Sequence, residues 1–399
     1  MNKKIIRNIL LLLAALLTFF LAFQFDKFLK NLKQTEKIIK KTEQEMKWIP
    51  AGHPYFQYTG RFNFLGDEKV FFAQSGCSVT IRFTGTKIHF FLKNYSAPDR
   101  FYHSNYFSVF IDSLQPILLH AVNDSSVYKI ENLEEGEHQL ILYKRTEAAC
   151  GLMELKGVFI EDNGEILPPP PRPKLRIEFI GNSITAGYGN EDTLNGRRFN
   201  PLTENHYLAY PSICARLLKA EHHSICYSGK GIYRNYDKSL TETLPTLYTR
   251  IYPQKKNHWN FSLWQPHIIV VNAGTNDFGQ GIPPVDSFVA AYTSFLIKIR
   301  KLNPESILIL VDGPLLKNGL KTDEETGMPI NTYSIYMRCL NMVVNNFKRA
   351  GYSNIYQFSF TPVGKNGYGT NWHPSVKQHQ INAEELSTYI RQSFPWLFK

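Results

Sequence analysis

The sequence predicts two domains, an all-β sandwich followed by an α/β domain built on a doubly wound parallel sheet. Three observations support this order. Short runs that alternate apolar and polar residues fill positions 48–166, and five strand candidates alternate with helical stretches after position 175. A dense run of prolines separates the two patterns. The 399 residues exceed one typical core, so two domains and a short additional segment are expected.

Residues 1–25 have the pattern of an export signal. Three basic residues among the first eight precede an apolar run that ends at Phe23. No cysteine follows that could carry a lipid, and no clear small-residue cleavage site precedes Asp26. A cleaved signal and an uncleaved N-terminal membrane anchor both fit, because the run can be extended to the length of a spanning helix. We therefore expect an exported protein that is periplasmic, extracellular or attached to the outer side of the cytoplasmic membrane.

Residues 26–47 are rich in lysine and glutamate and predict a solvated linker. The sandwich is expected over residues 48–166, where residues 78–92 form two strand candidates around Gly85. Further strand candidates recur at short spacing, divided by turn residues, as in a β-sandwich. They lie at residues 106–111 and 138–143.

Residues 167–174 contain five prolines, four of them consecutive, and predict a stiff extended linker. From residue 175 to 399 the pattern changes to strands that alternate with helices. The strand candidates are 176–180, 222–227, 267–273, 306–311 and 354–359, and the helical stretches are 206–219, 286–302, 331–350 and 375–393. This alternation predicts a parallel sheet covered by helices on both faces.

Charge and composition argue against several classes of partner and cofactor. Much of the net charge of +11 comes from the first 47 residues, and no basic run accompanies a nucleic-acid-binding motif, so we expect no nucleic-acid partner. The five cysteines fit neither a metal site nor a dense disulfide framework, although a Cys77–Cys150 disulfide is compatible with the sequence. No phosphate-binding glycine motif is present, and we expect neither a cofactor nor a metal.

Ser183 lies where the first strand of the α/β domain meets its first helix. Gly181 breaks the strand, and Asn182 or Ser183 is placed to cap the helix. In an open parallel sheet this edge binds ligands, and the helix start offers free N–H groups to a developing negative charge. Ser183 is therefore a candidate nucleophile, and the competing interpretation is an ordinary capping serine.

Three more motifs fall at the same predicted edge. Gly229 follows the second strand, Asn276 follows the third, and His373 precedes the last helix. Acyl transfer needs these residue types: a histidine accepts the serine proton, and preorganised donors stabilise the oxyanion. The N–H of Ser183, the N–H of Gly229 and the side chain of Asn276 would supply that oxyanion hole.

With these motifs the chain resembles the SGNH, or GDSL-type, hydrolase superfamily over residues 175–399. The resemblance rests on Gly181-Asn182-Ser183-Ile184-Thr185, Gly229, Gly274-Thr275-Asn276-Asp277 and His373-Pro374. It implies a flavodoxin-like sheet in which Ser183 and His373 are catalytic.

The domain order and several short segments further resemble carbohydrate esterase family 2. These segments are Tyr58-Thr59-Gly60-Arg61-Phe62, Gly85-Thr86 and Ser228-Gly229-Lys230-Gly231-Ile232. The resemblance implies an N-terminal jelly-roll sandwich and an acetyl esterase whose partner is an acetylated carbohydrate, of the acetylxylan or acetylmannan type. Two alternatives stay open: another SGNH lipase or thioesterase, and a catalytically inactive glycan-binding protein.

One position departs from the superfamily pattern. Thr370 stands where an aspartate usually precedes the histidine by three residues. This predicts a Ser183–His373 dyad in which a backbone carbonyl orients the imidazole, as in some members of carbohydrate esterase family 2. Asp277 and Asp312 are rival orienting groups, although capping of loops is the simpler role for both. Trp372, Tyr233 and Arg234 are candidates for substrate binding.

Overall fold

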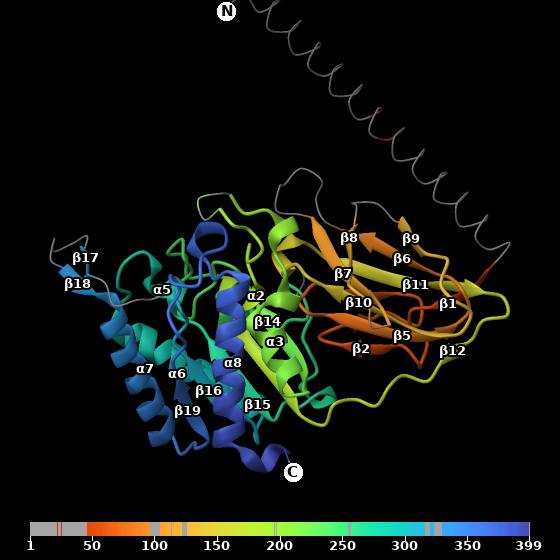
Figure 1. Ribbon diagram of the computed structural model, residues 1–399. Helices are drawn as coiled ribbons and strands as arrows, with labels where there is room; N and C mark the ends of the chain where they lie inside the picture. The colour runs from red at the N-terminus through yellow and green to blue at the C-terminus, as the bar shows by residue number, and fades with distance from the viewer. Residues whose placement is uncertain are drawn as a thin grey trace, which may run out of the picture.

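A computed structural model describes Ala22, Phe25 and residues 46–95, 104–112, 114–121, 126–194, 196, 198–253, 257–315, 320–322 and 329–398. Apart from Ala22 and Phe25, the expected signal or anchor at residues 1–25 lies outside these residues, as does the linker at 26–47 except for Met46 and Lys47. In the described part of the chain no helix is long and apolar enough to cross a membrane. Figure 1 shows the two domains side by side, an orange and yellow sandwich beside a green and blue α/β domain.

The first domain consists of two antiparallel six-stranded sheets. One sheet has the order β3-β4-β11-β6-β9, with β1 also paired to β11, and the other has the order β12-β5-β10-β7-β8, with β2 also paired to β5. Their bounds are β1 Met46–Pro50, β2 Gln57–Thr59, β3 Asn63–Phe64, β4 Val70–Phe72, β5 Ser78–Thr84, β6 Ile88–Asn94, β7 Asn105–Ile111, β8 Ile117–Ala121, β9 Ser126–Ile130, β10 Glu137–Lys144, β11 Met153–Glu161 and β12 Ile166–Leu167. Strand pairing therefore begins two residues before position 48 and ends one residue after position 166.

Alternation of side chains along the strands forms the sandwich core. In β5, Val79, Ile81 and Phe83 are buried while the residues between them are partly exposed. They pack against Leu92 of β6 and Leu155 of β11 in the facing sheet. The predicted all-β sandwich is confirmed.

The second domain has a five-stranded parallel sheet in the order β14-β13-β15-β16-β19. The strands are β13 Arg176–Gly181, β14 Glu221–Cys226, β15 Ile268–Asn272, β16 Ile307–Val311 and β19 Ile355–Phe358. In chain order this is 2-1-3-4-5, the flavodoxin-like arrangement, whose switch point lies beside the first strand. The predicted doubly wound sheet is confirmed.

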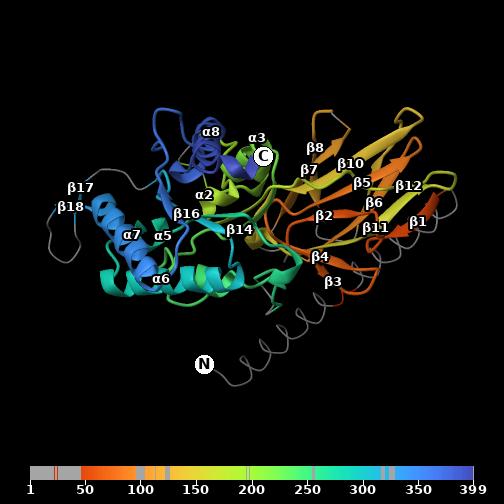
Figure 2. The ribbon, with the colours of Figure 1, turned by 90° about the horizontal axis from the view of Figure 1, so that it is seen from below.

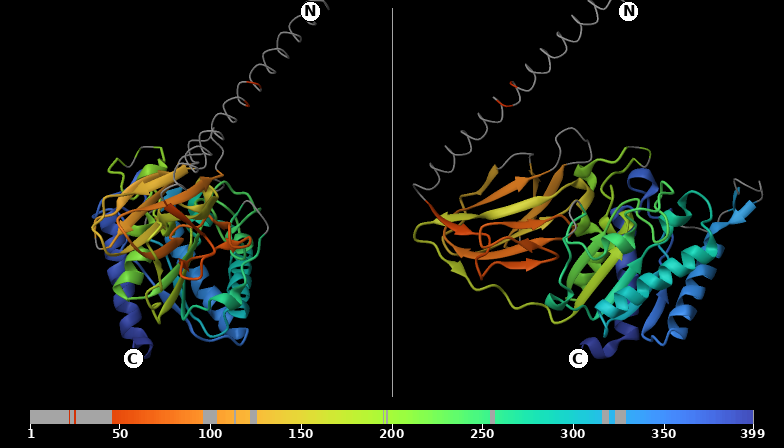
Figure 3. Two further views of the ribbon diagram at one scale, coloured as in Figure 1. Left: turned by 90° about the vertical axis from the view of Figure 1, so that its right-hand side faces the viewer. Right: turned by 180° about the vertical axis from the view of Figure 1, so that it is seen from behind.

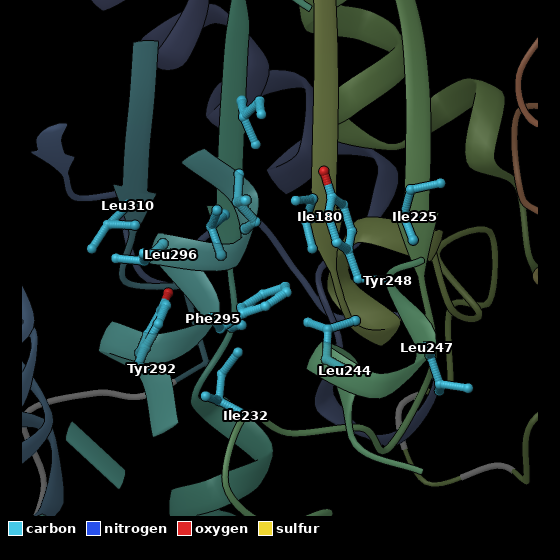
Figure 4. Close-up of a cluster of buried hydrophobic side chains, with 14 of the residues drawn as sticks. Ile180, Ile225, Ile232, Leu244, Leu247, Tyr248, Tyr292, Phe295, Leu296 and Leu310 are labelled. Carbon is cyan, nitrogen blue, oxygen red and sulfur yellow. The ribbon is translucent and has the colours of Figure 1, made fainter. Parts of the chain in front are cut away.

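Helices cover both faces of this sheet (Figure 2). They are α2 Ser183–Ala186, α3 Tyr210–Leu217, α4 Leu244–Leu247, α5 Thr275–Gly279, α6 Val285–Leu302, α7 Thr332–Arg349 and α8 Val376–Ser393. Ile180, Ile225 and Leu310 point toward α4 and α6 in Figure 4 and belong to the core on that face. Phe179 and Ile309 point to the other face, where they pack with α3 and α8. Strand residues are thus buried on both sides, as expected for parallel strands.

Short 3₁₀ turns and one hairpin complete the described elements. The turns are η1 Ala148–Cys150, η2 Pro201–Thr203, η3 His206–Leu208, η4 Phe261–Leu263, η5 Thr370–Trp372 and η6 Pro395–Phe398, and the hairpin strands are β17 Leu320–Thr322 and β18 Pro329–Asn331. The helix predicted over 206–219 is divided into η3 and α3. Ala209 is extended between them, because Pro211 favours the first turn of a new helix.

The two domains share a buried interface despite the proline linker. The guanidinium of Arg61 in the sandwich donates to the Glu178 carboxylate in β13 at 2.8 Å, and both side chains are buried. Tyr143 in β10 and Ser212 in α3 hydrogen-bond through their hydroxyl groups. Figure 3 shows the domains in contact along one side of each. A buried ion pair needs partners held in fixed geometry, so the two domains form one packed unit.

All five cysteines are buried, and none of them is in a disulfide. The disulfide considered for Cys77 and Cys150 is absent, and the two thiols have separate partners. Cys77 Sγ contacts the Arg61 carbonyl oxygen at 3.7 Å, and Cys150 Sγ contacts Glu204 Oε2 at 3.6 Å. Burial raises the pKa of the Cys77 thiol to about 12.

Candidate active site

The candidate site lies at the carboxyl edge of the parallel sheet, beside the switch point. Ser183 follows β13, Gly229 follows β14 and Asn276 follows β15, which are three adjacent strands. His373 follows β19 and immediately precedes the turn into α8. Carboxyl ends of parallel strands meet at one edge, so residues far apart in the sequence come together there.

Ser183 is the first residue of α2. Asn182 is the cap, and its Oδ1 accepts the N–H of Ile184 at 3.0 Å. The competing interpretation of Ser183 as a capping serine is therefore wrong, because its neighbour caps the helix. The side chain of Ser183 is 6% exposed, and its Oγ lies 2.7 Å from Nε2 of His373.

Two backbone carbonyls hold the His373 imidazole. Nδ1 lies 3.1 Å from the carbonyl oxygens of both Thr370 and Asn371. A carbonyl only accepts, so Nδ1 carries the proton and Nε2 faces Ser183 as an acceptor. The geometry provides a neutral orienting group at the position where Thr370 replaces an aspartate.

The histidine loop, defined here as residues 369–373, is fixed by its own backbone and by the segment after α2. The N–H of Thr370 donates to the Gly189 carbonyl at 3.0 Å, and its hydroxyl donates to Asp192 at 3.1 Å. The side chain of Thr370 therefore faces away from the imidazole. Gly189 has a φ of +54°, and a Cβ there would lie 2.3 Å from Thr370 Oγ1, so this contact requires glycine.

Burial dominates the electrostatics of His373. It lowers the pKa of the imidazole to about 4, although the two carbonyl contacts raise it. A neutral imidazole is the form that can accept a proton, so His373 is ready to act as a base throughout the neutral range.

Gly229 and Asn276 follow the two strands that flank β13, the strand that leads to Ser183. Gly229 has a φ of +75°, and a Cβ there would meet open space. One amide hydrogen of Asn276 is used, because Nδ2 donates to the Lys230 carbonyl at 2.8 Å. An amide has two such hydrogens, so one remains for a ligand.

Asp277 fixes the oxyanion loop, defined here as residues 228–234. Its carboxylate accepts the N–H groups of Ile232, Tyr233 and Arg234 at 2.9, 2.7 and 2.9 Å. Burial raises the pKa of Asp277 to about 6, while these N–H groups oppose the shift. No contact between this carboxylate and His373 is found among the described residues, so the aspartate caps a loop.

Asp312 has the same kind of role at the end of β16. Its carboxylate accepts the hydroxyl of Tyr333 at 2.6 Å and the N–H of Phe360 at 3.2 Å. Burial raises the pKa of this carboxyl group. Both rival orienting groups are thus committed to other partners.

The candidate substrate-binding residues differ in their surroundings. Trp372 is 59% exposed beside the base, and its ring lies edge-on to Tyr368 with centroids 5.2 Å apart. Arg234 is committed to α5, since Nε donates to the Asp277 carbonyl and Nη2 donates to the Gly281 carbonyl, each at 2.8 Å. Tyr233 is partly buried and packs against the core between the sheet and α6. Trp372 is therefore the most exposed of the three.

Two residues near the site were not predicted from the sequence. Asp192 holds the hydroxyl of Thr370, and Glu147 of the sandwich accepts the N–H of Ser228 at 2.7 Å. Both contacts join segments that are distant in the sequence, and neither residue belongs to a recognisable motif. No group of histidine, cysteine, aspartate or glutamate side chains that could hold a metal ion is found in the described part of the chain.

Family models match both domains. A model described as "Carbohydrate esterase 2 N-terminal" matches residues 58–170, and one described as "GDSL-like Lipase/Acylhydrolase family" matches residues 179–381. Together they cover most of the sandwich and most of the α/β domain.

Among curated proteins, the chain is 33% identical over 348 residues to "Cellulase/esterase CelE" of Acetivibrio thermocellus. That match covers 86% of this chain but only 40% of the length of CelE. It is also 24% identical over 379 residues to "Acetylxylan esterase / glucomannan deacetylase" of Cellvibrio japonicus, covering 92% of this chain and 96% of the relative.

Among solved structures, a family two carbohydrate esterase from Clostridium thermocellum in complex with cellohexaose is similar to this chain. It superposes with a TM-score of 0.77 at 32% identity, and the match covers 86% of this chain and 99% of that one. A family two carbohydrate esterase from Cellvibrio japonicus shares the fold, with a TM-score of 0.78 at 21% identity over 88% of this chain and 99% of that one.

Proposed function

The chain belongs to carbohydrate esterase family 2 of the GDSL-type hydrolases, and from this premise we propose that it removes O-acetyl groups from an acetylated carbohydrate. One observation carries the proposal: Ser183 Oγ and His373 Nε2 lie 2.7 Å apart at the carboxyl edge of the sheet. A nucleophile in hydrogen-bond contact with a neutral, oriented base is the arrangement that acyl transfer requires.

In the proposed reaction, Ser183 Oγ attacks the acetyl carbonyl carbon while His373 Nε2 takes the hydroxyl proton. The tetrahedral intermediate collapses to an acetyl-enzyme, and the imidazolium returns the proton to the leaving sugar oxygen. A water molecule then attacks the acetyl-enzyme with His373 again as base, which releases acetate and regenerates Ser183.

The oxyanion of the intermediate would be stabilised by the N–H groups of Ser183 and Gly229 and by the free amide hydrogen of Asn276. All three belong to the starts of helices or to the loop held by Asp277, so they need no rearrangement during the reaction. The imidazolium is held by dipoles of two carbonyls rather than by a carboxylate.

The exposed ring of Trp372 is proposed to contact the sugar that carries the acetyl group. An aromatic face beside the base offers an apolar surface to a pyranose ring, and its NH adds one donor. The acetylxylan and glucomannan activities named for a relative support an acetylated plant polysaccharide as the proposed substrate. Export is part of the same proposal, because such polymers lie outside the cell.

Two other functions remain rivals. A GDSL lipase or thioesterase would share Ser183 and His373 but prefer long acyl chains, while an inactive glycan-binding protein would bind the carbohydrate without releasing acetate. The close Ser183–His373 contact favours an active hydrolase over the binding protein.

The test is acetate release from acetylated xylan and glucomannan, with 4-nitrophenyl acetate and a long-chain ester in parallel. Ser183→Ala should reduce turnover to the residual level of triad-deleted enzymes, roughly 10³–10⁴-fold over water. The matched control is Ser387→Ala, because Ser387 is an equally buried serine in α8. Retention of more than a few per cent of activity in Ser183→Ala would exclude Ser183 as the nucleophile. Preference for the long-chain ester would favour the lipase.

A further inference from the structure

Glu147 of the sandwich contacts the backbone one residue before the proposed oxyanion donor Gly229. Its Oε2 accepts the N–H of Ser228 at 2.7 Å across the domain interface. Glu147 precedes η1 as its cap residue, yet its side chain makes no capping bond to that turn. The carboxylate therefore binds the backbone of the other domain instead of capping its own turn.

A second carboxylate makes the reciprocal contact. Glu204 of the α/β domain accepts the backbone N–H of Glu147 through Oε2 at 2.9 Å. Each domain therefore presents one carboxylate to a backbone N–H of the other. Both side chains are buried, with exposures of 2% for Glu147 and 0% for Glu204.

Lys144 fixes the segment that carries Glu147. Its ammonium is fully buried and donates to the carbonyl oxygens of Thr146 and Glu147 at 2.7 and 3.1 Å. Burial raises the pKa of Glu147, while Lys144 and the bond from Ser228 oppose that shift. A buried carboxyl group is costly unless it is paired, and Glu147 is paired through the N–H of Ser228.

The oxyanion loop consequently has anchors on both sides of Gly229. The Lys230 carbonyl is bound by Asn276, and Ile232 onward is bound by Asp277. Ser228, on the other side, is bound by Glu147. The Gly229 carbonyl also accepts the N–H of Tyr236 at 2.8 Å, and the Glu147 bond adds a side-chain anchor directly before Gly229.

We propose that Glu147 is a positioning residue for the Gly229 N–H, so that the sandwich domain completes the oxyanion hole of its neighbour. This inference rests on the proposed esterase function. A displacement of about 1 Å at a reacting group can cost roughly 10²-fold in rate. Loss of the Glu147 contact should therefore lower kcat while KM changes little, since the oxyanion exists mainly in the transition state.

The experiment compares three variants on 4-nitrophenyl acetate. Glu147→Ala should lower kcat by about 10- to 10²-fold with KM within twofold of the wild type. Glu147→Gln should keep most of the activity, because its amide oxygen can still accept the Ser228 N–H. Tyr143→Phe is the matched control, since it removes a buried interdomain hydrogen bond that does not touch the oxyanion loop. It should lower Tm and leave kcat unchanged.

Hydrogen exchange gives a readout independent of activity. Glu147→Ala should speed exchange of the amides at 228–231, whereas Tyr143→Phe should not. If Glu147→Ala fails to fold, Glu147→Asp keeps the charge and withdraws the carboxylate by one methylene, and the same kcat loss is expected. A folded Glu147→Ala with kcat within twofold of the wild type, or Glu147→Gln as impaired as Glu147→Ala, would overturn the proposal. Absence of esterase activity in the wild type would instead refute the proposed function.

Discussion

The oxyanion loop and the histidine loop both lie at the carboxyl edge of the parallel sheet and are held in different ways. The oxyanion loop is bound by two buried carboxylates, Asp277 from α5 and Glu147 from the sandwich. The histidine loop carries its base on backbone carbonyls, and its residues Asn371 and Trp372 have left-handed φ values of +50° and +64°. Such values are uncommon in residues other than glycine.

This difference shows that charged side chains preorganise the N–H groups of the oxyanion loop, whereas backbone carbonyls orient the base of the histidine loop. Carboxylates fix N–H groups firmly, so the oxyanion loop has its donors in place before substrate arrives. Backbone carbonyls fix the tautomer and direction of His373 but stabilise its charged form less than a carboxylate would. Five experiments test this contrast, beginning with the largest expected effect.

His373→Ala removes the base and leaves the oxyanion loop intact. We expect kcat to fall by about 10⁴-fold or more, the scale of losses for members of a catalytic unit. Single-turnover measurements with 4-nitrophenyl acetate would show the loss in the acylation step. A loss below tenfold would mean that another group accepts the serine proton.

Asn276→Ala removes the side-chain amide that is proposed as one donor of the oxyanion hole. One oxyanion donor is typically worth about 10²–10³-fold in kcat, and KM should change little because the bond forms in the transition state. Steady-state kinetics on an acetyl ester would measure the split. An increase in KM at constant kcat would instead make Asn276 a substrate-binding residue.

Asp277→Asn places an amide donor against three N–H groups. Leaving a buried donor unpaired costs about 1–3 kcal/mol, so we expect a lower Tm and a loss in kcat of roughly tenfold. The pH profile should keep its shape, and Asp312→Asn should leave kcat unchanged. A loss near 10⁴-fold in either variant would show that a carboxylate orients His373, because neutralising a true triad aspartate has that size.

The pH profile reports the state of His373. Its pKa is lowered to about 4, so kcat/KM should be constant above that value and fall about tenfold per pH unit below it. Stability should fall between about pH 6.5 and pH 4, because over that range the unfolded histidine binds a proton that the folded one does not. Initial rates and Tm between pH 3.5 and 7 would separate the two effects. An acid limb near pH 6.5 would contradict a partly buried, carbonyl-held base.

Trp372→Ala tests the exposed surface of the histidine loop and should have the smallest effect. An aromatic contact is worth about 0.5–1.5 kcal/mol, so KM for acetylated polysaccharide should rise by about two- to tenfold. Trp396→Ala is the control, because Trp396 is equally exposed, at 57%, near the C-terminus. The rate on 4-nitrophenyl acetate should be unchanged, and an equal rise in KM for both variants would refute the contact.

Most of the fold could be predicted from the sequence because burial leaves strong patterns. The continuous apolar run at 268–271 marks a strand covered on both faces, and the alternation in Ser78–Thr84 marks a sheet with one buried face. The division of residues 206–219 into η3 and α3 was not predicted, since helical periodicity continues through the extended Ala209.

The candidate site was predictable where function requires a special residue type at a strand end. Ser183, Gly229, Asn276 and His373 are such residues. Arg234 was an equally good candidate for substrate binding from the sequence. In the structure its Nε and Nη2 instead donate to carbonyl oxygens of α5 and of the residues just after it. Glu147 could not be found, because it acts through a contact with Ser228 that spans 81 residues and depends on how the domains pack.

The five buried thiols can be used to follow unfolding of the native chain. Burial raises the pKa values of Cys77 and Cys150 in one domain and of Cys214, Cys226 and Cys339 in the other. An alkylating reagent reacts with exposed thiolates, so it should label each cysteine only after the surrounding core opens. The order of labelling in denaturant would therefore reveal whether the sandwich and the parallel sheet come apart separately or as one cooperative unit.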